Sequence, residues 1–74
     1  MIDDNEDISI VIRRCKRSKT EKLELSNREL TSLPGSLFNL KHLIELDLSD
    51  NLLQSLNEEI VELVHLEIID LSNN

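Results

Sequence analysis

A 23-residue repeat of aliphatic residues constrains this chain more than any other feature of its sequence. Two columns of residues recur at this interval: Leu23, Leu46 and Ile69 in the first, and Leu25, Leu48 and Leu71 in the second. A fixed period of this size is typical of solenoids, in which each repeat forms about one strand and one turn and stacks on the next. The Leu-x-Leu alternation within each copy matches a short strand with two inward side chains. The period therefore predicts a solenoid, an architecture that offers a binding surface.

The segment before the repeats, residues 1–19, is predicted to form an acidic tail and a capping helix. Apolar residues occur at i, i+3, i+4 and i+7 from about residue 7 to residue 18: Ile8, Val11, Ile12 and Cys15. We expect Asn5 or Asp4 to cap the helix and acids to fill its first turn. Five bases follow within residues 13–19, where they suit the last turn of the helix: Arg13, Arg14, Lys16, Arg17 and Lys19. A nuclear signal or an acidic-lipid patch remains an alternative interpretation of these bases.

The second half of each repeat is predicted to contain a short helix. In the first copy, Pro34 and Gly35 suit a tight turn into a helix. In the second copy, Asn57 is a candidate cap, Glu58 and Glu59 fill the first turn, and a helical stripe follows it, formed by Ile60, Leu63 and Val64.

These positions match the leucine-rich repeat pattern LxxLxLxxNxLxxL. The second copy is complete and includes Leu43, Leu46, Leu48, Asn51, Leu53 and Leu56. The chain resembles intracellular 23-residue leucine-rich repeats over residues 20–74, about two and a half copies. The resemblance implies an α/β solenoid with parallel strands on the concave face and short helices on the convex face. It also implies that Asn51 and Asn74 tie backbone groups of neighbouring coils. Arg28 departs from this pattern and is expected to mark a first coil open toward the cap, with Asn27 as a possible substitute.

A narrower resemblance concerns the order of an amphipathic helix followed by LxLSNRxLTxLP. It is similar to the start of cytosolic repeat arrays in Ras-pathway scaffolds and Roco-type proteins, and it implies a signalling scaffold whose partners are small GTPases or their effectors. The alternative is the N-terminal sensor or scaffold segment of a larger signalling enzyme, such as a kinase or Roco-type GTPase, with its catalytic domain beyond Asn74.

The outward strand positions are the candidate partner-binding surface. Glu24, Asp47 and Asp70 form one acidic column with the 23-residue spacing. We hypothesise that this column receives a protein partner with a basic surface, and the alternative is an ordinary solvated face. The full predicted set comprises the strand residues and the polar residues that follow them: Lys22, Glu24, Ser26, Asn27, Glu45, Asp47, Ser49, Asp50, Asp70 and Ser72.

Composition argues against several other functions. The chain has 15 acidic and 8 basic residues, one Phe, and no Trp or Tyr, which disfavours nucleic-acid binding. Its single cysteine, Cys15, is expected to be a small core residue, and the 23-residue spacing of His42 and His65 follows from the repeat. We find no catalytic, cofactor or metal-binding motif, and we expect a protein that is not an enzyme. The acidic N-terminus and the lack of an apolar span predict a cytoplasmic protein.

The sequence stops at Asn74, just after the third predicted strand. Repeat proteins need a polar terminal cap, so we expect a truncated product or an incomplete gene model, ahead of a small protein that dimerises through its uncapped coil.

Overall fold

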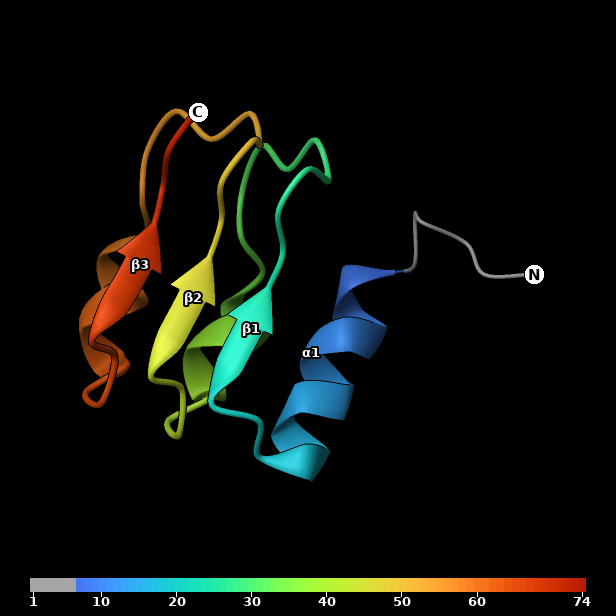
Figure 1. Ribbon diagram of the computed structural model, residues 1–74, viewed down its shortest axis with the longest axis vertical. Coiled ribbons are helices and arrows are strands. Elements are labelled where there is room, and N and C mark those ends of the chain that lie inside the picture. Colours follow the sequence, from blue (N-terminus) through green and yellow to red (C-terminus); the bar gives the residue numbers. More distant parts are fainter. Residues whose placement is uncertain (1–6) are drawn as a thin grey trace.

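Each copy of the repeat begins with a three-residue strand, and the three strands lie side by side in parallel. The computed structural model describes residues 7–74 (Figure 1), which form the following elements in order: α1 (Ile8–Ser18), β1 (Lys22–Glu24), the 3₁₀ helix η1 (Gly35–Asn39), β2 (Glu45–Asp47), the 3₁₀ helix η2 (Glu58–Glu62) and β3 (Ile68–Asp70). The strands form one open sheet in the order β1-β2-β3.

The register of the sheet reproduces the 23-residue period. Leu23 pairs with Leu46 across β1 and β2, and Leu46 pairs with Ile69 across β2 and β3. The backbone ladder continues past the strand ends, because Leu25 N–H donates to the Asp47 carbonyl at 2.9 Å and Leu48 N–H donates to the Asp70 carbonyl at 2.8 Å. Equivalent residues of successive repeats therefore lie next to each other.

The segments behind the sheet are 3₁₀ helices. Of the three residues expected to form a helical stripe, Val64 does not face the core. Leu63 is buried and Ile60 is half-buried, but the side chain of Val64 is 72% exposed. A 3₁₀ helix has three residues per turn, so Ile60 and Leu63 share a face, whereas Val64 lies beyond the end of η2 in the turn that follows it. Asn57 occupies the N-cap position of η2, yet its side chain makes no capping hydrogen bond.

The helix α1 is capped by Asp7, one residue before it begins. The Asp7 carboxylate accepts hydrogen bonds from the backbone N–H and the hydroxyl of Ser9, both at 2.9 Å, and these bonds lower the pKa of Asp7. The expected caps, Asp4 and Asn5, lie outside the described residues. The first turn contains no acid, so the expectation of acids there is wrong, whereas bases do occupy the last turn.

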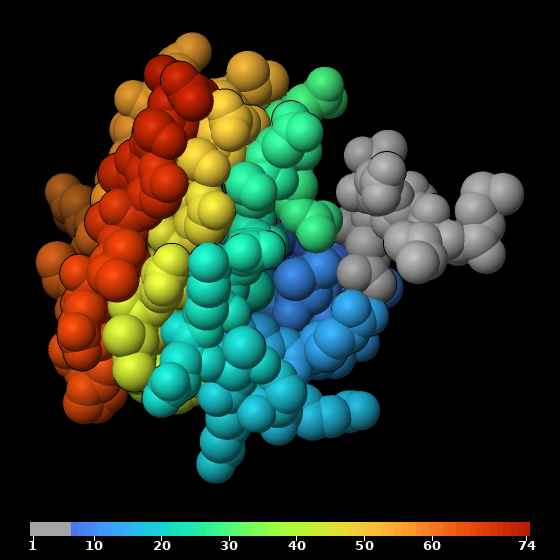
Figure 2. All heavy atoms as spheres, in the orientation of Figure 1, coloured from blue at the N-terminus to red at the C-terminus, as the bar shows by residue number. Residues whose placement is uncertain are grey.

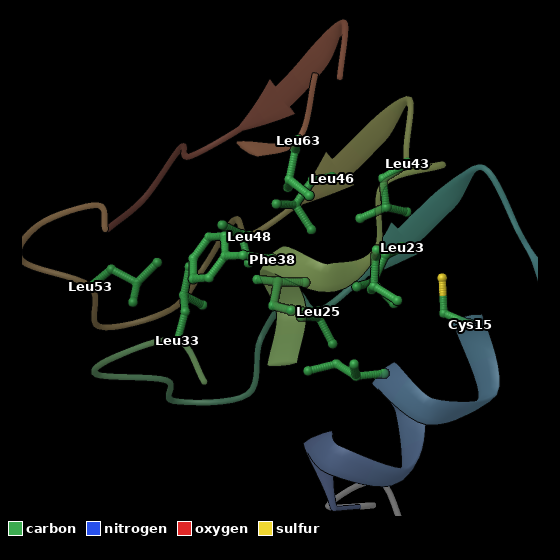
Figure 3. Close-up of a cluster of buried hydrophobic side chains, with 13 residues drawn as sticks. Cys15, Leu23, Leu25, Leu33, Phe38, Leu43, Leu46, Leu48, Leu53 and Leu63 are labelled. Atoms are coloured by element: carbon green, nitrogen blue, oxygen red, sulfur yellow. The ribbon is translucent and has the colours of Figure 1, made fainter. Parts of the chain in front are cut away.

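The core lies between the sheet and the 3₁₀ helices, and α1 extends it beside β1 (Figures 1 and 3). The two α1 residues that join it are Ile12 and Cys15, which are 3% and 5% exposed. The remaining buried apolar residues belong to the repeats: Leu23, Leu25, Leu33, Leu37, Phe38, Leu40, Leu43, Leu46, Leu48, Leu53 and Leu63. Burial is deepest around β2, because both β1 and β3 flank that strand.

Left-handed backbone conformations recur just after each strand. Asn27, Asp50 and Asn73 have φ angles of 54°, 56° and 57°, again at intervals of 23 residues. Asn and Asp tolerate this conformation better than other residues with a side chain. Glu29 also has a positive φ, 57°, and is neither Asn nor Asp.

We predict that Glu29→Gly stabilises the protein by about 1 kcal/mol, because glycine lacks the Cβ that disfavours a left-handed backbone. Urea unfolding followed by circular dichroism measures the change. Glu29→Ala is the matched control, since it removes the charge and keeps the Cβ, and it should bring no such gain. A Gly variant less stable than the Ala variant would contradict the prediction.

Candidate partner-binding surface

Alternation along the three short strands creates an exposed sheet face. The middle residues of β1 and β2 are buried in the core, whereas Ile69 in the middle of β3 is 36% exposed. The first and third residues of the strands form the other side of the sheet: Lys22, Glu24, Glu45, Asp47, Ile68 and Asp70. We call these six residues the exposed sheet face. Neighbouring strands lie about 4.8 Å apart, so the register places Glu24, Asp47 and Asp70 in a row of carboxylates across the strands. Figure 2 shows the three repeats side by side on this face.

Lys22 is the one base on this face, and it is engaged with two of its acids. Its Nζ lies 3.2 Å from an oxygen of Glu24 and 3.3 Å from an oxygen of Glu45. Both hydrogen bonds raise the pKa of Lys22. Because the three side chains are exposed, these ion pairs add little to stability. Lys22 therefore moderates the charge at the β1 end of the face, and the β3 end stays acidic.

The two aspartates of the row are held by the serine two residues further on. The Asp47 carboxylate accepts from Ser49 N–H at 3.0 Å and from Ser49 Oγ at 2.6 Å. The Asp70 carboxylate accepts from Ser72 N–H at 2.9 Å and from Ser72 Oγ at 2.6 Å. These Asx turns fix the direction of each carboxylate. Ser49 is only 8% exposed and its hydroxyl is turned to Asp47, so it offers a partner little surface.

Asn51 holds the first two repeats together beneath this face. Its Nδ2 donates to the carbonyls of Leu25 at 2.9 Å, Leu48 at 3.0 Å and Ser49 at 3.2 Å. Its Oδ1 accepts from the N–H groups of Arg28 at 3.0 Å and Leu30 at 3.1 Å. One 4%-exposed side chain thus satisfies five backbone groups from two repeats.

Asn74 repeats this arrangement one coil later. Its Nδ2 donates to the carbonyls of Leu48 at 3.0 Å, Leu71 at 2.9 Å and Ser72 at 3.2 Å. Its Oδ1 accepts from Leu53 N–H at 3.0 Å. Two equivalent asparagines therefore link three successive strands by corresponding bonds, except that Asn51 accepts one more backbone N–H than Asn74.

The leucine-rich repeat family matches residues 18–74 of this sequence. The chain belongs to the leucine-rich repeat family. A search of curated proteins finds no match. Leucine-rich repeats generally mediate protein–protein interaction, and they are typically non-catalytic binding modules. The matched residues include all three strands and both 3₁₀ helices.

The remaining predicted site residues lie in the leucine-rich repeat loops that follow the strands. Asn27 N–H donates to the Ser49 carbonyl at 3.1 Å, and Asp50 N–H donates to the Ser72 carbonyl at 2.9 Å. The side chains of Asn27 and Asp50 are exposed, and Ser26 is half-exposed. The structure thus places the loop residues at the carboxyl ends of the strands, next to the acidic row. The backbone N–H groups of Asn27 and Asp50 also hydrogen-bond to the next repeat, which is a structural role.

Cys15 and His42 are in contact in the structure, although the repeat pattern does not pair them. Cys15 Sγ lies 3.7 Å from His42 Nε2 and 3.5 Å from the Thr20 carbonyl oxygen. Burial raises the pKa of the Cys15 thiol, which keeps it protonated and unreactive. Cys15 is therefore a packing residue between α1 and the first repeat.

Within residues 7–74, no group of three His, Cys, Asp or Glu side chains is placed to hold a metal ion. In the same part of the chain, no helix combines the length and the apolar character needed to cross a membrane.

Removing the serine hydroxyl beside Asp70 should raise the pKa of that carboxyl group. The hydrogen bonds from Ser72 hold the pKa of Asp70 below its ordinary value. We expect Ser72→Ala to shift it upward, as measured by NMR titration of the side-chain carboxyl carbon. Because the folded pKa is the lower one, the stability from this bond is present above the unfolded pKa and is lost as the pH falls through the folded pKa. Ser36→Ala, on η1, is the control and should leave the pKa of Asp70 unchanged.

Proposed function

We propose that this protein is a non-enzymatic interaction module that binds a basic surface of a protein partner on its exposed sheet face. The observation that carries the proposal is the grouping of Glu24, Glu45, Asp47 and Asp70 on one side of the sheet, with Lys22 as the single base among them. Leucine-rich repeats generally bind proteins, and this face carries four of the eleven acids of residues 20–74.

The acidic row carries a cost that a basic partner would relieve. Like charges on neighbouring strands oppose folding slightly. The fold does not use these carboxylates for packing, since Glu24 and Asp70 are exposed and Asp47 is half-exposed. The Ser49 and Ser72 hydrogen bonds hold the two aspartates in place before a partner arrives. Complementary charge across such a face increases the association rate and selects among partners.

The wider setting of the proposal rests on the sequence. We propose a cytoplasmic scaffold in signal transduction whose repeats form a solenoid with the exposed sheet face on its concave side. Resemblance to the repeat arrays of Ras-pathway scaffolds and Roco-type proteins supports small GTPases or other signalling proteins as the partner class. The 23-residue register of the sheet supports the solenoid, because each added repeat would extend the same ladder.

A matched pair of charge-reversal variants tests the proposal. The first, Glu24→Lys with Asp70→Lys, changes the exposed sheet face, and the second, Glu58→Lys with Glu59→Lys, makes the same change in net charge on η2. Proteins captured by proximity labelling in cells would be purified, and their affinities for both variants measured. We expect at least tenfold weaker binding of a true partner to the sheet-face variant only.

Two outcomes count against the proposal. Equal weakening by both variants would mean that overall charge matters and that the face does not. Unchanged affinity of every partner for the sheet-face variant would mean that the acidic row is an ordinary solvated surface.

A further inference from the structure

A groove of about 410 Å³ lies between α1 and β1, beside the exposed sheet face. Its apolar lining comes from Val11, Cys15 and Leu23, and α1 and β1 lie side by side on the face shown in Figure 2. Arg14 borders the groove from α1, while Lys22 and Glu24 border it from β1. The groove thus offers a small apolar surface between a helix and the first strand of the sheet.

The strand that borders this groove has an open edge. Alternate residues of a parallel strand direct their N–H and C=O groups to opposite sides. Glu21 and Leu25 bond toward β2, through Glu45 N–H and the Asp47 carbonyl, so the intervening Lys22 and Glu24 direct their backbone groups away from β2. Within residues 7–74, β2 is the only strand beside β1. An open strand edge next to an apolar groove accepts an extended peptide as an added strand.

The charge around the groove selects an acidic occupant. On the β1 side, Lys22 and Glu24 offset each other, with 3.2 Å between their charged atoms. On the α1 side, residues 7–19 contain one acid, Asp7, and five exposed bases: Arg13, Arg14, Lys16, Arg17 and Lys19. Residues 20–74 contain eleven acids and three bases. Residues 7–19 therefore contain more bases than acids, although the whole chain is acidic.

A second hollow continues this basic surface along α1. It has a volume of about 240 Å³ and is lined by Ile10, Arg13, Arg14 and Arg17. The side chain of Ile10 is 42% exposed there and gives a bound peptide a further apolar contact. Arg14 borders both hollows, so it stands at the centre of the combined surface.

We propose that the groove between α1 and β1 binds an extended acidic peptide segment of another protein as a fourth strand at the edge of β1. An apolar side chain of the peptide packs between Val11 and Leu23, and its carboxylates face the bases of α1. This site shares Lys22 and Glu24 with the exposed sheet face, but its remaining charged residues lie on α1 and are basic. It does not depend on the function proposed for that face.

Short synthetic peptides test the charge and the position of this site on the full chain. The probe is a fluorescent ten-residue peptide of alternating leucine and glutamate, measured by anisotropy at low salt. We expect binding that weakens at least tenfold when glutamine replaces glutamate. Arg14→Glu should weaken binding about tenfold, whereas Lys41→Glu, the same charge change beside η1, should alter it less than twofold. Equal effects of the two variants would overturn the proposal.

Backbone methylation of the peptide tests strand addition. One peptide is N-methylated at every leucine and another at every glutamate, so each loses the hydrogen-bond donors of one strand edge. We expect one peptide to lose binding and the other to retain it, and equal affinities would overturn the proposal. Vesicles containing phosphatidylserine are the third probe. Vesicle binding that Arg14→Glu abolishes, without any peptide binding, would assign the bases to a membrane surface and also overturn it.

Discussion

Asn51→Ala should lower the free energy of unfolding by about 3 kcal/mol or more. The Asn51 side chain is 4% exposed and makes five hydrogen bonds to backbone groups of two repeats. Alanine would leave those groups without the partner they have in the fold, and each buried unsatisfied group costs about 1–3 kcal/mol. Water reaching part of the resulting cavity would reduce this sum. A domain of this size has a stability of only about 5 kcal/mol, so the variant should be close to unfolding at 25 °C.

The equivalent substitution one coil later is the matched control. Asn74 makes the same kinds of bond, but its side chain and two of the carbonyls that it contacts are exposed, where water replaces a lost partner. We expect Asn74→Ala to cost about 1 kcal/mol. Urea unfolding of both variants, followed by circular dichroism, makes the comparison. Equal costs at the two positions would contradict the view that burial of the Asn51 network determines its contribution.

The repeat period predicted the arrangement of the strands because it fixes which residues become neighbours. Once Leu23, Leu46 and Ile69 occupy equivalent positions, parallel pairing at a 23-residue offset follows. The same period does not separate a 3₁₀ helix from an α-helix. Ile60, Leu63 and Val64 fit an α-helical stripe in sequence, and the shorter turn that connects adjacent strands leaves Val64 outside the core.

The helix cap illustrates a second limit of the sequence. Residues 1–7 contain Asp3, Asp4, Asn5 and Asp7, and both Asp and Asn are preferred N-cap residues. The choice of Asp7 depends on where the apolar stripe of α1 meets the first repeat. This docking places Ile12 and Cys15 in the core and starts the helix at Ile8. A local pattern does not contain that information.

The acidic row follows from the 23-residue spacing of Glu24, Asp47 and Asp70. The sequence also contains a pattern that indicates the serine hydrogen bonds to the two aspartates. Asp47 and Ser49, and then Asp70 and Ser72, repeat an Asp-x-Ser spacing that is typical of Asx turns. The contact of Cys15 with His42 has no such signal, because the two residues are 27 positions apart and meet only through the packing of α1. The groove between α1 and β1 has the same origin, so only the folded structure shows it.

Leu48→Ala should destabilise the protein by about 3 kcal/mol. Leu48 is 0% exposed and packs in the core between the sheet and the 3₁₀ helices. Truncating a buried leucine removes its transfer free energy and leaves a cavity, which together cost about 2–5 kcal/mol. The neighbouring repeats on both sides limit how far the surroundings can close around that cavity. The free energy of unfolding in urea measures the loss.

Leu71 is the same residue type at the same repeat position, and it provides the control. Its side chain is 39% exposed, so Leu71→Ala should cost less than about 1 kcal/mol. Because the two variants share the residue type and the repeat position, a difference between their free energies of unfolding reports the effect of burial. A cost at Leu71 equal to that at Leu48, and growing with protein concentration, would contradict the prediction. It would show that a second copy covers Leu71 and Ile69 beside β3, as the hypothesis of self-association through that coil requires.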